Sequence, residues 1–211
     1  MLTKKTVEFF LDELASSSPA PGGGSSAALA AATGSALISM VCNLTIGKKK
    51  YLDVEEEMKK ILIDSERIRK RLTELIDKDT EAFNKVMEAY SLPKESDAQK
   101  SLRNAAIDSA LKEAALIPLE VMKHCVDALA LSKIVAQKGN KNSISDAGVS
   151  ALLLVSAAES AYLNVKINLN SINDPDFVGW KNEEANSTLN SCRKYQTEIM
   201  NSVYEVLEAK I

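Results

Sequence analysis

Apolar residues recur every three or four positions along one stretch that runs from Met58 to Tyr90. This spacing matches the 3.6-residue period of an α-helix, and no glycine or proline interrupts it before Pro93. Asp53 with Glu56 three residues later predicts that Asp53 is the N-cap of this helix. A long helix with one apolar face needs other helices to cover that face, which favours a helical bundle.

The rest of the chain carries the same helical spacing. Ser96 with Gln99 repeats the capping pattern, and Pro118 must kink or interrupt the helix in which it lies, with a further helix following it. No run of residues favours a strand, and aromatic residues make up only 5% of the chain. The additional helical segments are residues 7–14, 25–44, 96–117, 118–135, 149–168 and 177–206.

The segment 25–44 is rich in alanine, glycine and serine, which allow helices to approach closely. We therefore expect an all-α, up-and-down bundle of long helices, forming a single domain over residues 1–211. Close packing of this kind often continues across the interface of a dimer.

Composition narrows the function. The chain is 45% hydrophobic and 26% charged with a net charge of −3, so it has no basic excess for nucleic acid. Lys4, Lys5 and Glu8 stand where a signal peptide needs an apolar run, and no stretch approaches the ~20 apolar residues of a membrane span. We expect a cytoplasmic protein that binds neither nucleic acid nor membrane.

Cysteine and histidine offer no metal site or disulfide framework. The cysteines are odd in number and far apart, so we expect them in the core. His124 is the only histidine and is predicted to be a surface or boundary residue. The three cysteines are Cys42, Cys125 and Cys192.

The segment from Ser16 to Ser25 breaks the helical pattern with two prolines and three consecutive glycines. It lacks the lysine of a phosphate loop and follows a helix rather than the strand of a dinucleotide fingerprint. Its bare backbone and the amides at the start of the next helix favour a planar or anionic ligand, although a plain linker is the alternative. The predicted ligand-binding residues here are Pro21, Gly22, Gly23, Gly24 and Ser25.

Asp79 lies within about 30° of the centre of the apolar stripe of its helix, whereas Asp77 falls near the opposite, polar face. A carboxylate on an apolar face must be paired, hydrogen-bonded or raised in pKa, and a raised pKa suits a general acid or base. The alternative is a buried aspartate paired with a lysine or arginine from another helix.

A set of amides and hydroxyls near residues 140 and 164 is suited to binding the polar edge of a heterocycle. The alternatives are helix capping, hydrogen bonds between helices and, for Lys48, a solvated side chain instead of one that holds an anionic tail. The predicted binding residues are Lys48, Asn140, Asn142, Ser145, Asp146, Asn164 and Asn168.

Together these segments resemble the cyclodeaminase/cyclohydrolase family of folate enzymes, in the same order and over nearly the whole chain. The matching motifs are Ser18-Pro19-Ala20-Pro21-Gly22-Gly23-Gly24-Ser25, Asp79-Thr80-Glu81-Ala82-Phe83, Gly139-Asn140 through Ser145-Asp146, and Asn164-Val165-Lys166-Ile167-Asn168-Leu169.

The resemblance implies an all-α homodimer that binds a tetrahydrofolate derivative at or near the subunit interface, with Asp79 as the catalytic aspartate and no cofactor beyond the folate. The expected reaction is hydrolysis of 5,10-methenyltetrahydrofolate to 10-formyltetrahydrofolate. The first alternative is a formiminotetrahydrofolate cyclodeaminase that releases ammonia. The second is a helical dimer that binds folate without catalysis, or is purely structural.

The sequence has no formiminotransferase domain before the matching region, which favours the stand-alone cyclohydrolase. No residue separates the two substrates. An ion pair to Asp79 would weaken the case for an enzyme, because a carboxylate neutralised by a cation is a poor acid or base.

Overall fold

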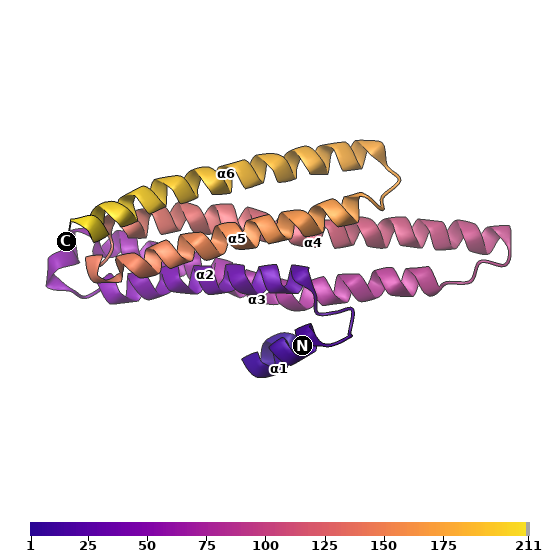
Figure 1. The fold of residues 1–211 in the computed structure, drawn as a ribbon, viewed down its shortest axis with the longest axis horizontal. Coiled ribbons are helices and arrows are strands. Elements are labelled where there is room, and N and C mark those ends of the chain that lie inside the picture. The colour runs from indigo at the N-terminus through magenta and orange to yellow at the C-terminus, as the bar shows by residue number, and fades with distance from the viewer. Residues whose placement is uncertain (210–211) are drawn as a thin grey trace.

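The computed structural model describes residues 1–209, and these contain six α-helices and no strand. Five helices, α2 to α6, form an elongated bundle in which consecutive helices run in alternating directions, while α1 lies to one side (Figure 1). The expected all-α, up-and-down bundle is confirmed. The helices are α1 (Val7–Ala15), α2 (Gly23–Thr45), α3 (Glu55–Ser91), α4 (Asp97–Lys138), α5 (Ile144–Leu169) and α6 (Pro175–Glu208).

Three of the six α-helices, α1, α4 and α6, begin at a residue whose side chain caps the helix. Ser96 and Gln99 form the predicted capping box of α4, and Asp174 caps α6 by accepting from the backbone N–H of Phe177. The prediction that Asp53 caps α3 is wrong, because Asp53 lies inside a short 3₁₀ helix, η2 (Lys49–Val54).

The first turn of α3 makes no side-chain cap and instead carries three successive acidic residues, Glu55 to Glu57. Negative charge at a helix N-terminus interacts favourably with the helix dipole. The pattern of Asp53 and Glu56 therefore marked the right region but the wrong residue.

Pro118 does not end its helix, and the separate helix expected after it is the continuation of α4. Proline has no N–H to donate to the carbonyl four residues earlier, which belongs to Ala114. The side-chain amide of Asn168 on α5 donates to that carbonyl at 2.9 Å. A neighbouring helix thus supplies the hydrogen bond that the proline cannot make.

The core is packed closely through small residues, as predicted. At Gly34 of α2, an added Cβ would lie 2.8 Å from the Leu154 side chain of α5. The Ser150 hydroxyl of α5 donates to the Gly34 carbonyl at 2.8 Å. All three cysteines are buried and free, as expected, and burial raises the pKa of Cys42 to about 12.

Two helices are long and apolar enough to span a membrane by length and composition, so the expectation that no stretch approaches such a span is wrong. The segments are Gly23–Thr45 and Lys141–Leu169, with mean hydropathies of 1.6 and 1.3. About half of each apolar window is buried inside the bundle, 56% and 50% respectively. Core helices of a bundle produce the same pattern.

Candidate functional site

A pocket of about 450 Å³ lies where the glycine loop meets α3, α4 and α5. Its volume falls within the range of about 300–1,000 Å³ that is usual for small-molecule sites. Asp79 projects from α3, and Asn164 and Asn168 line the pocket from α5. The structure therefore brings together three of the predicted polar site residues with the predicted loop.

The glycine loop contributes backbone to this pocket through Gly22, Gly23 and Gly24. Two other predicted residues of the loop lie elsewhere. Pro21 lines a second, neighbouring hollow, and Ser25 is completely buried beneath Asp79.

Gly24 is a close-approach position, because an added Cβ would overlap the Asp79 carboxylate. At Gly23 an added Cβ would instead lie 3.4 Å from the amide nitrogen of Asn164. Gly24 is thus more than part of a linker, because only a residue without a side chain lets Asp79 of α3 reach the start of α2.

The carboxylate of Asp79 accepts a hydrogen bond from the Ser25 hydroxyl at 2.9 Å. Burial raises the pKa of Asp79 above its ordinary value, although hydrogen bonds from Ser25 act in the opposite direction. Within residues 1–209, no lysine, arginine or histidine lies within 4.0 Å of this carboxylate. The alternative of a buried ion pair is therefore wrong.

The prediction that Asp77 lies near a polar face of its helix is wrong. Asp77 is buried, with only 7% of its surface exposed. Its carboxylate accepts from the backbone N–H of Leu2 and, at 2.6 Å, from the Thr3 hydroxyl. The N-terminal 3₁₀ helix η1 (Leu2–Lys4) covers this side of α3. Helical periodicity could not reveal that α3 is covered on two sides.

The side-chain amides of Asn164 and Asn168 each donate a hydrogen bond to a backbone carbonyl. Asn164 donates to Ser160 of its own helix at 2.9 Å, and Asn168 donates to Ala114. Across residues 1–209, neither amide oxygen accepts a hydrogen bond, so both remain acceptors for a ligand on the pocket side. The inter-helix hydrogen bond offered as the alternative role of Asn164 is wrong, because Asn164 bonds within α5. Asn168 makes such a bond to α4, which is compatible with its expected binding role.

The remaining predicted residues lie at the other end of the bundle. The side-chain amide of Asn140 donates to the Leu44 carbonyl at 2.9 Å, and its backbone N–H donates to the Thr45 hydroxyl at 2.9 Å. These contacts are at the C-terminal end of α2, whose N-terminal end carries the glycine loop. Within one chain, none of these residues lines the pocket of Asp79. Their role in binding stays a prediction. The residues concerned are Lys48, Asn140, Asn142, Ser145 and Asp146.

Sequence reasoning missed most of the apolar wall of the pocket. The wall residues of α3 follow Asp79 at helical spacing, a signal that the periodicity contained, whereas those of α4 had no such signal. The wall residues are Ala82, Phe83, Val86, Met87 and Tyr90 on α3, with Leu111 and Ala114 on α4. A flat ring can lie between this wall and the glycine backbone.

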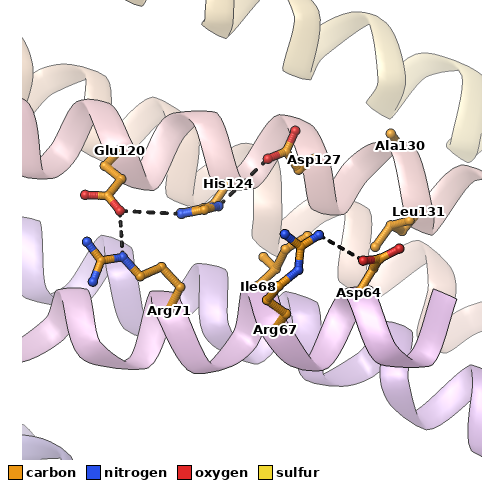
Figure 2. A pocket seen from close by; sticks show the side chains of 9 residues that line it. All are labelled: Asp64, Arg67, Ile68, Arg71, Glu120, His124, Asp127, Ala130 and Leu131. Atoms are coloured by element: carbon orange, nitrogen blue, oxygen red, sulfur yellow. Dashed lines mark hydrogen bonds and ion pairs between the residues drawn. The ribbon is translucent and has the colours of Figure 1, made fainter. Parts of the chain in front are cut away.

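A larger hollow of about 650 Å³ lies between α3 and α4 (Figure 2). Its charged side chains pair with one another: Arg71 bonds Glu120 at 2.6 Å and Arg67 bonds Asp64 at 2.8 Å. His124 lies 3.6 Å from Glu120, at the boundary position expected for it. Because both arginines of this groove are already paired with carboxylates, it is a weaker candidate than the pocket at Asp79.

Comparison with known proteins gives the decisive observation. Residues 6–187 match the family model described as formiminotransferase-cyclodeaminase. The chain belongs to the formiminotransferase-cyclodeaminase family. The resemblance inferred from the four motifs is therefore confirmed.

Individual members of the family differ in length and in name. The chain is 46% identical to the methenyltetrahydrofolate cyclohydrolase of Methylorubrum extorquens over the full length of both proteins. It is 32% identical to the formimidoyltransferase-cyclodeaminase of Sus scrofa, covering 91% of this chain but only 36% of that protein.

A solved structure of formiminotetrahydrofolate cyclodeaminase from Thermotoga maritima superposes with a TM-score of 0.88 at 33% identity. The similarity covers 98% of this chain and all of the other. The likeness includes α1 and the pocket region, because so little of either chain lies outside it.

Proposed function

We propose that this chain hydrolyses 5,10-methenyltetrahydrofolate to 10-formyltetrahydrofolate, with Asp79 as general acid and base. The observation that carries the proposal is Asp79 itself, a partly buried carboxylate without a cationic partner among residues 1–209, set against bare glycine backbone in a ligand-sized pocket. The full-length similarity to a protein named methenyltetrahydrofolate cyclohydrolase supports this choice of reaction.

The pocket suits a flat heterocycle with a polar edge. Phe83 and Tyr90 belong to the apolar wall, while Asn164 and Asn168 offer amide oxygens to ring N–H groups. Backbone of Gly23 and Gly24 lines the same pocket.

The reaction needs one group that both accepts and donates protons. Asp79 removes a proton from water as the water oxygen bonds to the methenyl carbon, giving a neutral carbinolamine. The bond from that carbon to N5 then breaks, the hydroxyl proton leaves, and N5 is protonated. A carboxylate with a raised pKa is suited to exchange protons in both directions.

Cyclodeamination is the second candidate, because the Thermotoga maritima structure bears that name and shares this fold along its whole length. There the same carboxylate would assist attack by the folate nitrogen on the formimino carbon and the departure of ammonia. A non-catalytic folate-binding or structural role is disfavoured by the absence, among residues 1–209, of an ion pair that would hold Asp79 inert.

The test follows the loss of methenyltetrahydrofolate absorbance above the buffer rate, in parallel with ammonia release from formiminotetrahydrofolate. We expect the first activity in wild type and a loss of about 10²-fold or more in Asp79→Asn. Asp127→Asn is the matched control, since Asp127 lines the separate groove of Figure 2 and should leave the rate unchanged. Inactivity of wild type in both assays would disprove an enzyme function.

We also propose that the protein forms a homodimer, in which a second copy of this chain is the partner. Helix α2 has no charged residue along its length, and it packs beside α5 (Figure 1). Several large apolar side chains on the outward faces of these two helices are exposed. They are Met40 and Leu44 on α2, and Val149, Leu152, Leu163 and Ile167 on α5. Patches of this kind on proteins in water usually mark interfaces.

An antiparallel second copy fits the placement of the family motifs. Helix α2 is about 35 Å long and separates the glycine loop from Asn140. Two antiparallel copies joined through α2 and α5 would bring Asn140–Asp146 of one chain towards Asp79 of the other. Ile167 belongs to both the exposed face and the pocket, so the two are continuous.

Light scattering tests the proposed dimer. We expect twice the mass of one chain for wild type, and a single-chain mass for the double variant Leu152→Lys with Leu163→Lys. Trp180→Lys, which also replaces an exposed apolar residue but on α6, should stay dimeric. A wild-type monomer that binds lipid vesicles would overturn the dimer in favour of a membrane partner.

We further propose that the protein works in the cytoplasm, with tetrahydrofolate as its only organic ligand and no nucleic acid. Its net charge of −3 and three free, buried thiols support this setting.

A further inference from the structure

The Ser25 hydroxyl lies among three oxygen atoms, although it has one proton to donate. Its Oγ is 3.0 Å from the Ile76 carbonyl oxygen, 2.9 Å from Asp79 Oδ2 and 3.3 Å from Thr80 Oγ1. Ser25 is fully buried at the start of α2. A single hydroxyl cannot donate to the Ile76 carbonyl and to an ionised Asp79 at the same time.

Two hydrogen-bond arrangements resolve this conflict. When Asp79 is ionised, Ser25 donates to the carboxylate. When Asp79 is protonated, its O–H donates to Ser25 Oγ, and Ser25 is free to donate to Ile76 or to Thr80. Burial raises the pKa of Asp79 and so favours the protonated arrangement, whereas the hydrogen bonds from Ser25 lower it and favour the ionised one.

Thr80 connects this network to a different part of the surface. It lines a second hollow of about 390 Å³, together with Lys5 and Glu81, whose side chains are exposed. Asp79 does not line that hollow, and Thr80 does not line the pocket. The loop at Ala20 borders both spaces and separates them.

We propose that Ser25 and Thr80 form a proton path that carries the proton gained by Asp79 out of the folate pocket and into the second hollow. This inference rests on the proposed hydrolysis, which consumes one water and releases one proton overall. A bound folate fills the pocket and closes the direct route from Asp79 to solvent, so a route behind the carboxylate keeps proton release independent of product release.

The transfer balances at each oxygen. Asp79 gives its proton to Ser25 Oγ while the original Ser25 proton passes to Thr80 Oγ1. Thr80 in turn releases its own proton to water or buffer in the second hollow. Each hydroxyl loses one proton and gains another, so neither carries charge afterwards. Rotation of the two hydroxyls restores the starting arrangement.

Thr80→Val tests the path, because it removes the hydroxyl while keeping the branched shape. We expect kcat for methenyltetrahydrofolate to fall about tenfold with KM unchanged, and the solvent deuterium isotope effect on kcat to increase. Thr80→Ser keeps the hydroxyl and should recover most of the rate. Thr197→Val is the matched control, because Thr197 is an exposed residue of α6 whose hydroxyl donates to the Arg193 carbonyl of the same helix.

Ser25 provides a second, independent measurement. Ser25→Ala should lower kcat and move the pH–rate profile to higher pH, since a hydrogen bond that lowers the pKa of Asp79 is lost. Ser25→Thr should recover part of the rate, because it retains the hydroxyl.

The outcomes separate the two proposals. An active wild type with an unchanged Thr80→Val, or a Thr80→Ser variant as slow as Thr80→Val, would overturn the proton path alone. A wild type inactive on methenyltetrahydrofolate would overturn the proposed hydrolysis and, with it, this path.

Discussion

The carboxylate of Asp79 occupies the space that a side chain at Gly24 would need. Gly24 lies in the first turn of α2 and Asp79 lies in the middle of α3, so the contact fixes how these two helices meet. The glycine is required by the position of the carboxylate and not by a positive φ angle, because Gly47 is the one glycine with such an angle among residues 1–209.

Gly24→Ala should therefore displace Asp79 and lower kcat by about 10²-fold, the scale of a lost general acid–base group. Alanine normally stabilises a helix relative to glycine, so the fold should persist. Gly179→Ala on α6 is the control, because nothing lies within 4 Å of its added Cβ. It should raise the free energy of unfolding by about 0.5–1 kcal/mol without changing kcat. A Gly24→Ala enzyme with wild-type kcat would contradict the proposed role of this contact.

Stability should depend on pH through Asp79. Burial raises the pKa of Asp79 above the ordinary value of 3.8, so the folded state loses stability relative to the unfolded state as pH rises from the ordinary pKa through the raised one. Asp79→Asn should be more stable than wild type at pH 8, and its advantage should shrink as pH falls towards 4. Urea unfolding at several pH values measures the difference.

Glu66 supplies a control of opposite sign for this experiment. Its hydrogen bond with Arg69 lowers the pKa of Glu66 to about 2. Stability from this pair is present above the ordinary pKa and is lost as pH falls through the lowered one. Glu66→Gln should thus be less stable than wild type at pH 8 and approach it in acid. An Asp79→Asn advantage that does not vary with pH would contradict the inferred shift.

Asn168 and Pro118 should be coupled in stability, because both act on the Ala114 carbonyl. Asn168→Leu leaves that buried carbonyl without a donor, which costs about 1–3 kcal/mol. In a Pro118→Ala background the alanine N–H can bond the carbonyl, and the same substitution should cost less. Denaturant unfolding of the four proteins gives the coupling energy, and strictly additive effects would argue against this compensation.

Asp77 is predicted to hold the N-terminal segment in place. Asp77→Ala removes the acceptor for Leu2 and Thr3 and should destabilise the fold by about 1–3 kcal/mol. Hydrogen exchange should increase at residues 2–6. Asp64→Ala on the same helix removes only an exposed ion pair with Arg67 and should change stability by less than about 1 kcal/mol. Equal effects of the two variants would refute the anchoring role.

The fold was largely predictable because each long helix carries its own periodicity and its own end signals. Capping by Ser96 could be read locally, since all of its partners lie within one turn. Continuity through Pro118 could not, because the compensating donor comes from Asn168, fifty residues away in the chain.

The site was predictable only in part, for a related reason. Helical projection singled out Asp79 correctly, but it assigned Asp77 to solvent because the covering residues Leu2 and Thr3 lie at the other end of the sequence. The sequence also grouped Asn140, on the loop before α5, with Asn164 on the helix itself. The length of α5 places these two residues near its opposite ends.

The anchoring of Leu2 has a practical consequence for making the protein. Met1 and Leu2 line the second hollow, next to Thr80, so a purification tag fused before Met1 would start at that opening. The C-terminal end of α6 lies at the far end of the bundle (Figure 1). Kinetic measurements are therefore best made with a tag at the carboxyl end, or with an amino-terminal tag that is removed beforehand.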